Sequence, residues 1–184
     1  MNARLALNKL SDAQLVVLAR QQLPHASGAY EELMQRYEKA LLSFCRNTCG
    51  NQHDAEDVLQ EVLLSVFHNL YRFRGESAFK TWLYRIAYNE CVSLIRRRKD
   101  HDEINPEIMD YVDEQAALQE EDHAGFYRLM SHLEEEDRSV IALRLISDLE
   151  FKDIASITDS GLSAVKMRYQ RALKKLEPYM EDKK

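Results

Sequence analysis

The chain has little of the material that tight turns and disulfide bonds require. Its 184 residues include five glycines and three prolines, too few for the many turns of an all-β fold. Its three cysteines, an odd number, do not make a disulfide framework and fit a reducing compartment. Since 45% of the residues are apolar, packed cores can form, and we expect an all-α protein with one ordinary domain or two small ones.

The sequence also has no long apolar run and no arrangement typical of an enzyme. No stretch approaches the roughly 18 to 20 apolar residues of a membrane span, and the N-terminal MNARLALNKLSD lacks the apolar core of a signal peptide. The six histidines are scattered, and no glycine-rich phosphate loop is present. We therefore expect a cytoplasmic protein without membrane insertion, catalytic residues or cofactor.

Charge is unevenly distributed along the chain. The 25 Lys and Arg and 31 Asp and Glu give a net charge of −6, which argues against a protein that coats DNA by electrostatics alone. Residues 68–101 contain eight bases and three acids, a net charge of +5, whereas residues 102–137 contain one base and thirteen acids, a net charge of −12. Such segregation predicts separate surfaces for separate partners.

Aromatic and basic residues alternate in YRFRGESAFKTWLYRIAYNECVSLIRRRK, residues 71–99. This combination suits opened, single-stranded nucleic acid, because unstacked bases bind aromatic rings and the phosphate backbone binds cations. The same pattern also fits a helix with an aromatic core face and a solvated basic end, and we assign Trp82 to the core.

Apolar periodicity predicts a four-helix N-terminal bundle. A first helix begins at a capping box formed by Ser11 and Gln14 and ends before Pro24. Further helices are expected from about Gly28 to Cys49, over 54–70, and from an N-cap at Ser77 to about Lys99. We assign residues 1–100 to this domain.

An acidic segment broken by Asn105-Pro106 follows, and we interpret residues 101–121 as a linker. About 22 extended residues span at most roughly 70 Å, about two turns of B-DNA. Residues 122–184 form the predicted C-terminal domain, with helices near 123–133 and 137–147.

The segment LEFKDIASITDSGLSAVKMRYQRALKKL, residues 149–176, has the pattern of a helix-turn-helix. Residues 161–176 contain five bases and no acid, as expected of a recognition helix in a major groove. The predicted buried stripe of its second helix consists of Leu162, Val165, Tyr169, Ala172, Leu173 and Leu176. A solvated basic helix is the alternative interpretation.

Cys45, Cys49 and His53 recur every four residues and could lie on one helical face. Gly50 interrupts that helix and no fourth ligand is evident, so we interpret the thiols as buried. Zinc and a redox role stay alternatives, and no metal site is assigned. A carboxylate metal site around Asp54, Glu56 and Asp57 lacks a completing ligand, and acids in a first turn stabilise a helix dipole.

The chain resembles the extracytoplasmic-function (ECF) sigma factors. The resemblance rests on four motifs taken together and in order: AYEELMQRY, DAEDVLQEVLLSVF, FRGESAFKTWLYRIAYNEC and the helix-turn-helix. ECF sigma factors are two-domain promoter-specificity subunits of bacterial RNA polymerase, with a sigma-2-like bundle and a sigma-4-like helix-turn-helix domain. Within the family, the chain looks most similar to the SigX-type subgroup in two segments, ISDLEFKDIA and GLSAVKMRYQRALKKL. The resemblance covers nearly the whole chain.

The resemblance implies three sets of contact residues. The docking face, for the clamp helices of the polymerase β′ subunit, comprises Asp57, Gln60, Glu61 and Leu64. The −10 set, for bases flipped from the non-template strand, comprises Arg74, Lys80, Tyr84, Arg85, Tyr88, Asn89 and Arg96. The −35 set, on the second helix of the helix-turn-helix, comprises Ser163, Lys166, Met167, Arg168, Gln170, Arg171 and Lys174.

Common family members have Arg-Ser where Lys166-Met167 stand here, so the −35 motif recognised by this chain can differ. The partners implied are core RNA polymerase, through its β′ clamp helices and β flap, promoter DNA, and an anti-sigma factor. The linker resembles the segment that the family threads toward the RNA exit path.

Two other classes of protein are compatible with the residues alone. A helix-turn-helix regulator would bind duplex DNA without polymerase and use the bundle as a sensor. A protein-interaction adaptor would have basic helices that are only solvated, and would show no dependence on DNA. An electrophoretic assay with and without core polymerase separates the three. The promoter sequence and the inducing signal do not follow from the sequence.

Overall fold

The computed structural model describes residues 6–104 and 121–181, and within these ranges the regular elements are all helical, with no strand. The helices are α2 (Asp12–Gln22), α3 (Gly28–Cys49), α4 (Gln52–Asn69), α5 (Phe79–Ile104), α6 (Glu121–Met130), α7 (Glu135–Leu145), α8 (Phe151–Ile157) and α9 (Leu162–Glu181), with a short 3-10 helix η1 (Leu70–Arg72) between α4 and α5. The predicted all-α fold class is confirmed. No helix in the described part of the chain is long and apolar enough to cross a membrane.

Local chemistry sets the ends of the first three long helices. Ser11 and Gln14 form the predicted capping box at the start of α2, with each side chain accepting a hydrogen bond from the other residue's backbone N–H. Gly50 adopts a left-handed conformation, with φ of 88°, and ends α3 at Cys49. Asn51 caps α4, where its side chain accepts from the backbone N–H of Asp54 at 2.8 Å.

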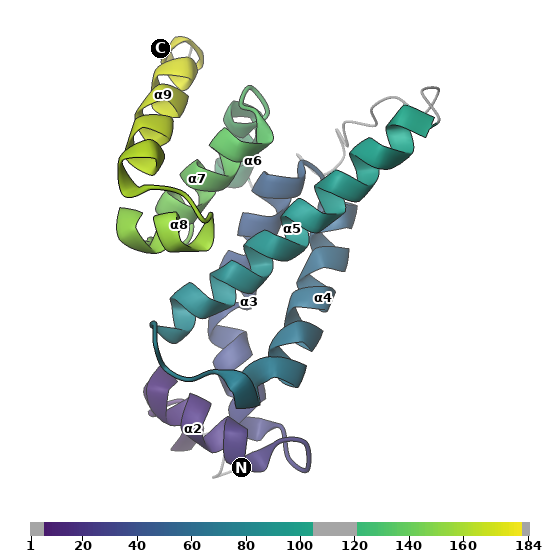
Figure 1. Ribbon diagram of the computed structural model, residues 1–184, viewed down its shortest axis with the longest axis vertical. Coiled ribbons are helices and arrows are strands. Elements are labelled where there is room, and N and C mark those ends of the chain that lie inside the picture. Colours follow the sequence, from purple (N-terminus) through teal and green to yellow (C-terminus); the bar gives the residue numbers. More distant parts are fainter. Residues whose placement is uncertain (1–5, 105–120, 182–184) are drawn as a thin grey trace.

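The helices form two groups that pack against each other. In Figure 1, α3, α4 and α5 lie side by side with α2 across their lower end, and α6 to α9 form a second group beside them. α3 contacts α7 and α5 contacts α8, so the two groups meet along the same side of the bundle. α5 continues to Ile104 and α6 begins at Glu121, so the predicted linker 101–121 is helical at both ends, and its residues 105–120 lie outside the described residues.

One buried apolar cluster runs through both groups. Its largest fully buried members are Tyr84, Phe44, Leu15, Leu33, Leu41, Leu70, Leu83, Met130, Ile141, Leu143, Ile154 and Val62. Leu162 departs from the prediction, because it is 44% exposed at the first residue of α9. The rest of the predicted stripe of α9 is buried or half-buried.

Tyr84 also departs from the prediction. The sequence suggested that its ring faces DNA, whereas the structure places it in the core, 0% exposed and edge-on to Phe44 with 5.5 Å between ring centroids. Burial raises the pKa of its phenol. Tyr84 is therefore a packing residue in this arrangement and we remove it from the −10 set.

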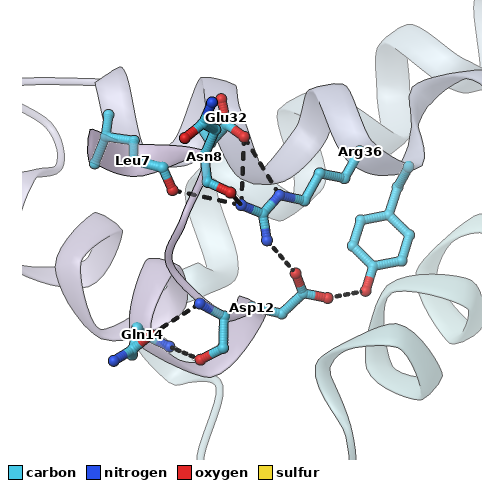
Figure 2. A network of polar contacts seen from close by, with 8 residues as sticks. Leu7, Asn8, Asp12, Gln14, Glu32 and Arg36 are labelled. Carbon is cyan, nitrogen blue, oxygen red and sulfur yellow. Dashed lines mark hydrogen bonds and ion pairs between the residues drawn. The ribbon is translucent and has the colours of Figure 1, made fainter. Parts of the chain in front are cut away.

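A polar network holds the N-terminal segment on α3 (Figure 2). Arg36 pairs with Asp12 at 2.9 Å and donates to the backbone carbonyl oxygens of Leu7 and Asn8, while the Tyr37 hydroxyl donates to the same Asp12 carboxylate. Burial and the hydrogen bond to Asp12 raise the pKa of Tyr37. Because the guanidinium has several donors in one plane, a single side chain satisfies acceptors on both segments.

Arg36→Lys should lower the free energy of unfolding by about 1 to 2 kcal/mol, because an ammonium keeps the charge but not the planar set of donors. Urea denaturation followed by circular dichroism measures the change. Lys39→Met, which removes an exposed cation one turn further along α3, is the control and should be nearly neutral. An Arg36→Lys protein as stable as the parent would show that the network does not fix α2.

Tyr84→Ala should destabilise the protein by about 3 to 5 kcal/mol, because it leaves a cavity beside Phe44. Tyr84→Phe keeps the ring and should cost much less. The same denaturation experiment tests both. If Tyr84→Ala unfolds at the urea concentration of the parent, the side chain is not part of the core.

Candidate nucleic-acid interfaces

The loop before α5 is held in place by an aromatic cluster. Phe73 and Phe79 are buried, and Trp82 lies against both rings with centroid separations of 5.2 and 5.8 Å. Trp82 is half-buried, consistent with its assignment to the core. Gly75 adopts φ of 75°, which favours glycine, at the turn between these rings. The loop therefore starts from a fixed base while its intervening residues stay exposed.

The remaining −10 residues lie along this loop and α5. Arg74, Arg85, Asn89 and Arg96 are exposed, and Lys80 and Tyr88 are half-buried. Arg74 lies 4.0 Å from Glu76 in a solvent-exposed pair, a contact that contributes little to stability. Within the described residues the Asn89 amide has no hydrogen-bond partner, so it is free to donate to and accept from a base edge.

One end of α5 contacts the second group of helices. Arg85 Nη2 donates to the backbone carbonyl oxygen of Ser156 at 2.7 Å and also bonds to the Ser156 hydroxyl. Thr81 Oγ1 lies 3.3 Å from Asp153 Oδ1. Burial and the nearby carboxylate of Glu136 raise the pKa of the Tyr88 phenol.

Three contact residues, Thr81, Asp153 and Ser156, were not predicted from the sequence. Their partners are more than 70 positions away along the chain. Apolar periodicity describes one helix at a time, so no pattern in the sequence pairs α5 with α8.

The docking face lies on the exposed side of α4. Asp57, Gln60 and Glu61 are exposed, and Leu64 is 52% exposed, one to two turns further along the helix. His53 lies 3.3 Å from Asp57, and both side chains are mostly exposed. An apolar side chain surrounded by polar and acidic groups is typical of a protein interface.

The acids at the start of α4 behave as helix-end residues. Asp54 accepts from the Asn51 side chain and pairs with Arg98 at 2.8 Å. Glu56 accepts from Gln52 in the same helix. These contacts fit the structural role considered for the two acids.

Six of the seven residues of the −35 set are exposed on α9, and the seventh, Arg168, is half-buried. Two cations of this helix are held by the acidic first turn of α7: Arg168 pairs with Glu136, and Lys175 pairs with Asp137 at 2.7 Å. The hydrogen bond to Asp137 raises the pKa of Lys175. Lys166, Arg171 and Lys174 have no ion pair within the described residues, so their charges are available to phosphates or base edges.

The predicted buried thiols are confirmed, because Cys45, Cys49 and Cys91 are free and buried. Contacts with the other two thiols, followed by burial, raise the pKa of Cys91 well above its usual range. His53 is exposed and paired with Asp57, so it does not join the thiols. No group of three or more metal-ligating side chains occurs among the residues described. Cys91, which lies on α5, was not grouped with the other two from the sequence.

Comparison with known families matches two segments of the chain. Residues 33–101 match Sigma-70 region 2, and residues 123–176 match Sigma-70 region 4. The first match includes α4 and most of α5, and the second includes α7, α8 and most of α9.

The chain is similar to sigma factors, and the match covers most of this chain and most of each relative. The chain is 29% identical to RNA polymerase sigma-H factor of Pseudomonas aeruginosa over 168 residues, covering 83% of this chain and 86% of the relative. It is 31% identical to the ECF RNA polymerase sigma-E factor of Haemophilus influenzae, covering 81% and 86%, and 32% identical to that of Escherichia coli, covering 78% and 82%.

Two solved structures share the fold. One is CnrH in complex with the cytosolic domain of CnrY, with a TM-score of 0.71, 24% identity, and coverage of 94% of this chain and 99% of that one. The other is the sigma factor RpoE in complex with the anti-sigma factor NepR from Bartonella quintana, with a TM-score of 0.73, 22% identity, and coverage of 84% and 98%. The two region matches and the coverage of whole relatives lead to one conclusion: the chain belongs to the ECF RNA polymerase sigma factors.

Proposed function

We propose that this sigma factor docks on core polymerase through the docking face of α4 and recognises the −10 element with the exposed −10 residues of the loop 71–79 and α5. We further propose that it recognises the −35 element with the −35 set on α9. The observation that carries the proposal is that two exposed basic surfaces lie in the segments that match region 2 and region 4.

The chemistry of each surface supports its assigned element. The loop 71–79 and α5 carry exposed cations, the half-buried ring of Tyr88 and the Asn89 amide, which has no hydrogen-bond partner within the described residues, and this combination suits a flipped base and an opened strand. On α9, exposed Arg, Lys and Gln side chains lie on one helix, which suits the edges of a major groove. The domain limits that we propose are residues 1–100 and 122–184, joined by residues 101–121.

Four finer assignments are also proposals. SigX-type membership is supported by the residues of the helix-turn-helix that were quoted for it. Sigma factors are regulatory proteins, so we infer that any chemistry belongs to the polymerase and that the chain acts in the cytoplasm. An anti-sigma partner is supported by the neighbour that was solved in complex with the anti-sigma factor NepR.

An electrophoretic assay with a promoter selected by the reconstituted holoenzyme tests the proposal. The chain with core polymerase should shift the fragment, and the chain alone should not. Equal shifts without polymerase would support a stand-alone helix-turn-helix regulator instead. A pull-down that depends on neither DNA nor polymerase would support an adaptor.

Glu61→Lys should weaken binding to core polymerase by about 2 to 5 kcal/mol while helicity stays unchanged, because an exposed carboxylate on the docking face is reversed. Titration of labelled protein with core polymerase measures the affinity. Glu38→Lys makes the same reversal at an exposed acid of α3 and should leave affinity unchanged. Equal affinities for both variants would remove α4 from the docking surface.

Arg171→Ala should reduce promoter recognition by about 1 to 3 kcal/mol if the guanidinium contacts a base edge. Transcription from a promoter series substituted across the −35 element measures the loss, which should concentrate at one position. Lys39→Ala removes one exposed charge from α3 and should not alter the series. Identical profiles for Arg171→Ala and the parent would show that this face does not recognise sequence.

Asn89→Ala should leave polymerase binding intact and reduce open-complex formation, with relaxed preference at one −10 position, because the paired donor and acceptor are lost. Permanganate footprinting of thymines on a duplex promoter and on a pre-melted promoter separates base capture from duplex contact. Gln21→Ala, a change of an exposed amide on α2, is the control. If Asn89→Ala opens the duplex promoter as the parent does and keeps its base preference, the pocket assignment is wrong.

A further inference from the structure

The loop 71–79, which contributes Arg74 to the −10 set and leads into α5, has only local contacts between its anchoring rings. Residues 74–78 are all exposed. No atom lies within 4 Å of the position that a Cβ on Gly75 would take. Arg74 and Glu76 form a solvent-exposed pair 4.0 Å apart, which contributes little to order. The position of this segment, which we call the −10 loop, therefore depends on what holds its two ends.

The first end of the −10 loop is held by α2. Arg20 Nη2 donates a hydrogen bond to the backbone carbonyl oxygen of Tyr71 at 3.2 Å. α2 also contacts η1, the 3-10 helix that contains Tyr71. Because the donor is a guanidinium, this hydrogen bond is charge-assisted. Although Tyr71 is 60% exposed, its backbone is in this way attached to the bundle.

The second end of the −10 loop is connected to the same helix through aromatic rings. Asp12, the first residue of α2, accepts a hydrogen bond from the Tyr37 hydroxyl. The Tyr37 ring lies edge-on to Phe79, the first residue of α5, with 5.8 Å between centroids. Phe79 lies edge-on to Phe73 at 5.9 Å. A path of direct contacts thus leads from α2 to both buried rings of the loop.

The α2 end of this path is itself fixed. Arg36 pairs with Asp12 at 2.9 Å and donates to the carbonyl oxygens of Leu7 and Asn8 (Figure 2). Tyr37 is half-buried, and burial followed by the hydrogen bond to Asp12 raises the pKa of its phenol. The phenol therefore stays protonated at neutral pH and remains a donor to Asp12.

We propose that α2 positions the −10 loop, with Arg20 and Tyr37 as the positioning residues. Figure 1 shows α2 beside the segment that joins α4 to α5, and α2 contacts both η1 and α5. Neither residue belongs to the −10 set: Arg20 acts through the carbonyl oxygen of Tyr71, and Tyr37 acts through the ring of Phe79. The role in promoter recognition rests on the proposed function of the loop.

Positioning matters here because capture of a flipped base is costly. Unstacking a base takes free energy, and a loop that is ordered before binding loses no further affinity to its own ordering. If only a fraction of the chains holds the loop in the competent geometry, the apparent affinity for the base falls by that fraction. Loss of either contact to α2 should therefore loosen the loop without DNA and weaken base selection with DNA.

Arg20→Met is the main variant, because it keeps an unbranched side chain and removes the donor to Tyr71. Arg20→Lys keeps a charged donor on a long stem and should restore much of the effect. Lys39→Met removes one exposed cation from α3 and is the matched control. Tyr37→Phe removes the hydroxyl that binds Asp12, keeps the ring beside Phe79, and tests the second end.

Amide hydrogen exchange of the free chain is the first measurement. The Phe73 N–H donates to the carbonyl oxygen of Leu70 at 3.1 Å, so its exchange reports opening at the start of the −10 loop. Arg20→Met should exchange this amide at least about threefold faster than the parent, and Arg20→Lys should lie between them. A direct phosphate contact by Arg20 predicts no change, because the sample contains no DNA. Equal exchange in Arg20→Met and Lys39→Met would overturn the proposal.

Open-complex formation by the holoenzyme on promoters substituted across the −10 element is the second measurement. Arg20→Met and Tyr37→Phe should reduce discrimination at the position that Asn89 recognises by about threefold, while Lys39→Met keeps the profile of the parent.

The proposal is overturned if Arg20→Met loosens the loop and keeps the base preference of the parent while Asn89→Ala loses it. If neither variant alters the profile, the −10 assignment fails, and faster exchange in Arg20→Met still supports α2 as the element that positions the loop. The two failures are therefore distinguishable.

Discussion

The helix α5 has to be buried and accessible at once, and most of the structure follows from that constraint. Leu83, Ala87 and Cys91 are fully buried, which fixes the axis of the helix within the bundle. The opposite side of the same turns carries Arg85 and Asn89, whose exposure is set by the burial of their neighbours. A helix held along its length in this way can present polar groups to a ligand without rearranging its own backbone.

In the second group of helices, several cations are already paired with carboxylates of the same chain. The acidic first turn of α7 pairs with Arg168 and Lys175 of α9 and with Lys99 of α5. The three acids therefore hold Arg168, a member of the −35 set, and two cations on the same helices as the proposed DNA-contact residues. Their position at a helix N-terminus, where negative charge is favoured, accounts for their placement without any ligand. What the pairing adds is a competition between carboxylates and phosphates for the same cations.

Much of the fold was predictable because local rules dominate it. The capping box at Ser11, the left-handed Gly50 and the apolar spacing of α3 set helix boundaries without help from distant residues. The exposed face of α9 followed from the same periodicity. Prediction failed where tertiary packing decides. Tyr84 was grouped with the basic residues around it but lies against Phe44, and Leu162 was assigned to the buried stripe of α9 but is 44% exposed.

The central claim is that one chain carries two promoter-contacting surfaces and uses them only together with polymerase. Hydroxyl-radical footprinting of the reconstituted holoenzyme on a selected promoter measures this directly. Two protected segments about two helical turns apart are expected with core polymerase, and none with the chain alone. A single protected segment with polymerase, or the same footprint in its absence, would contradict the account.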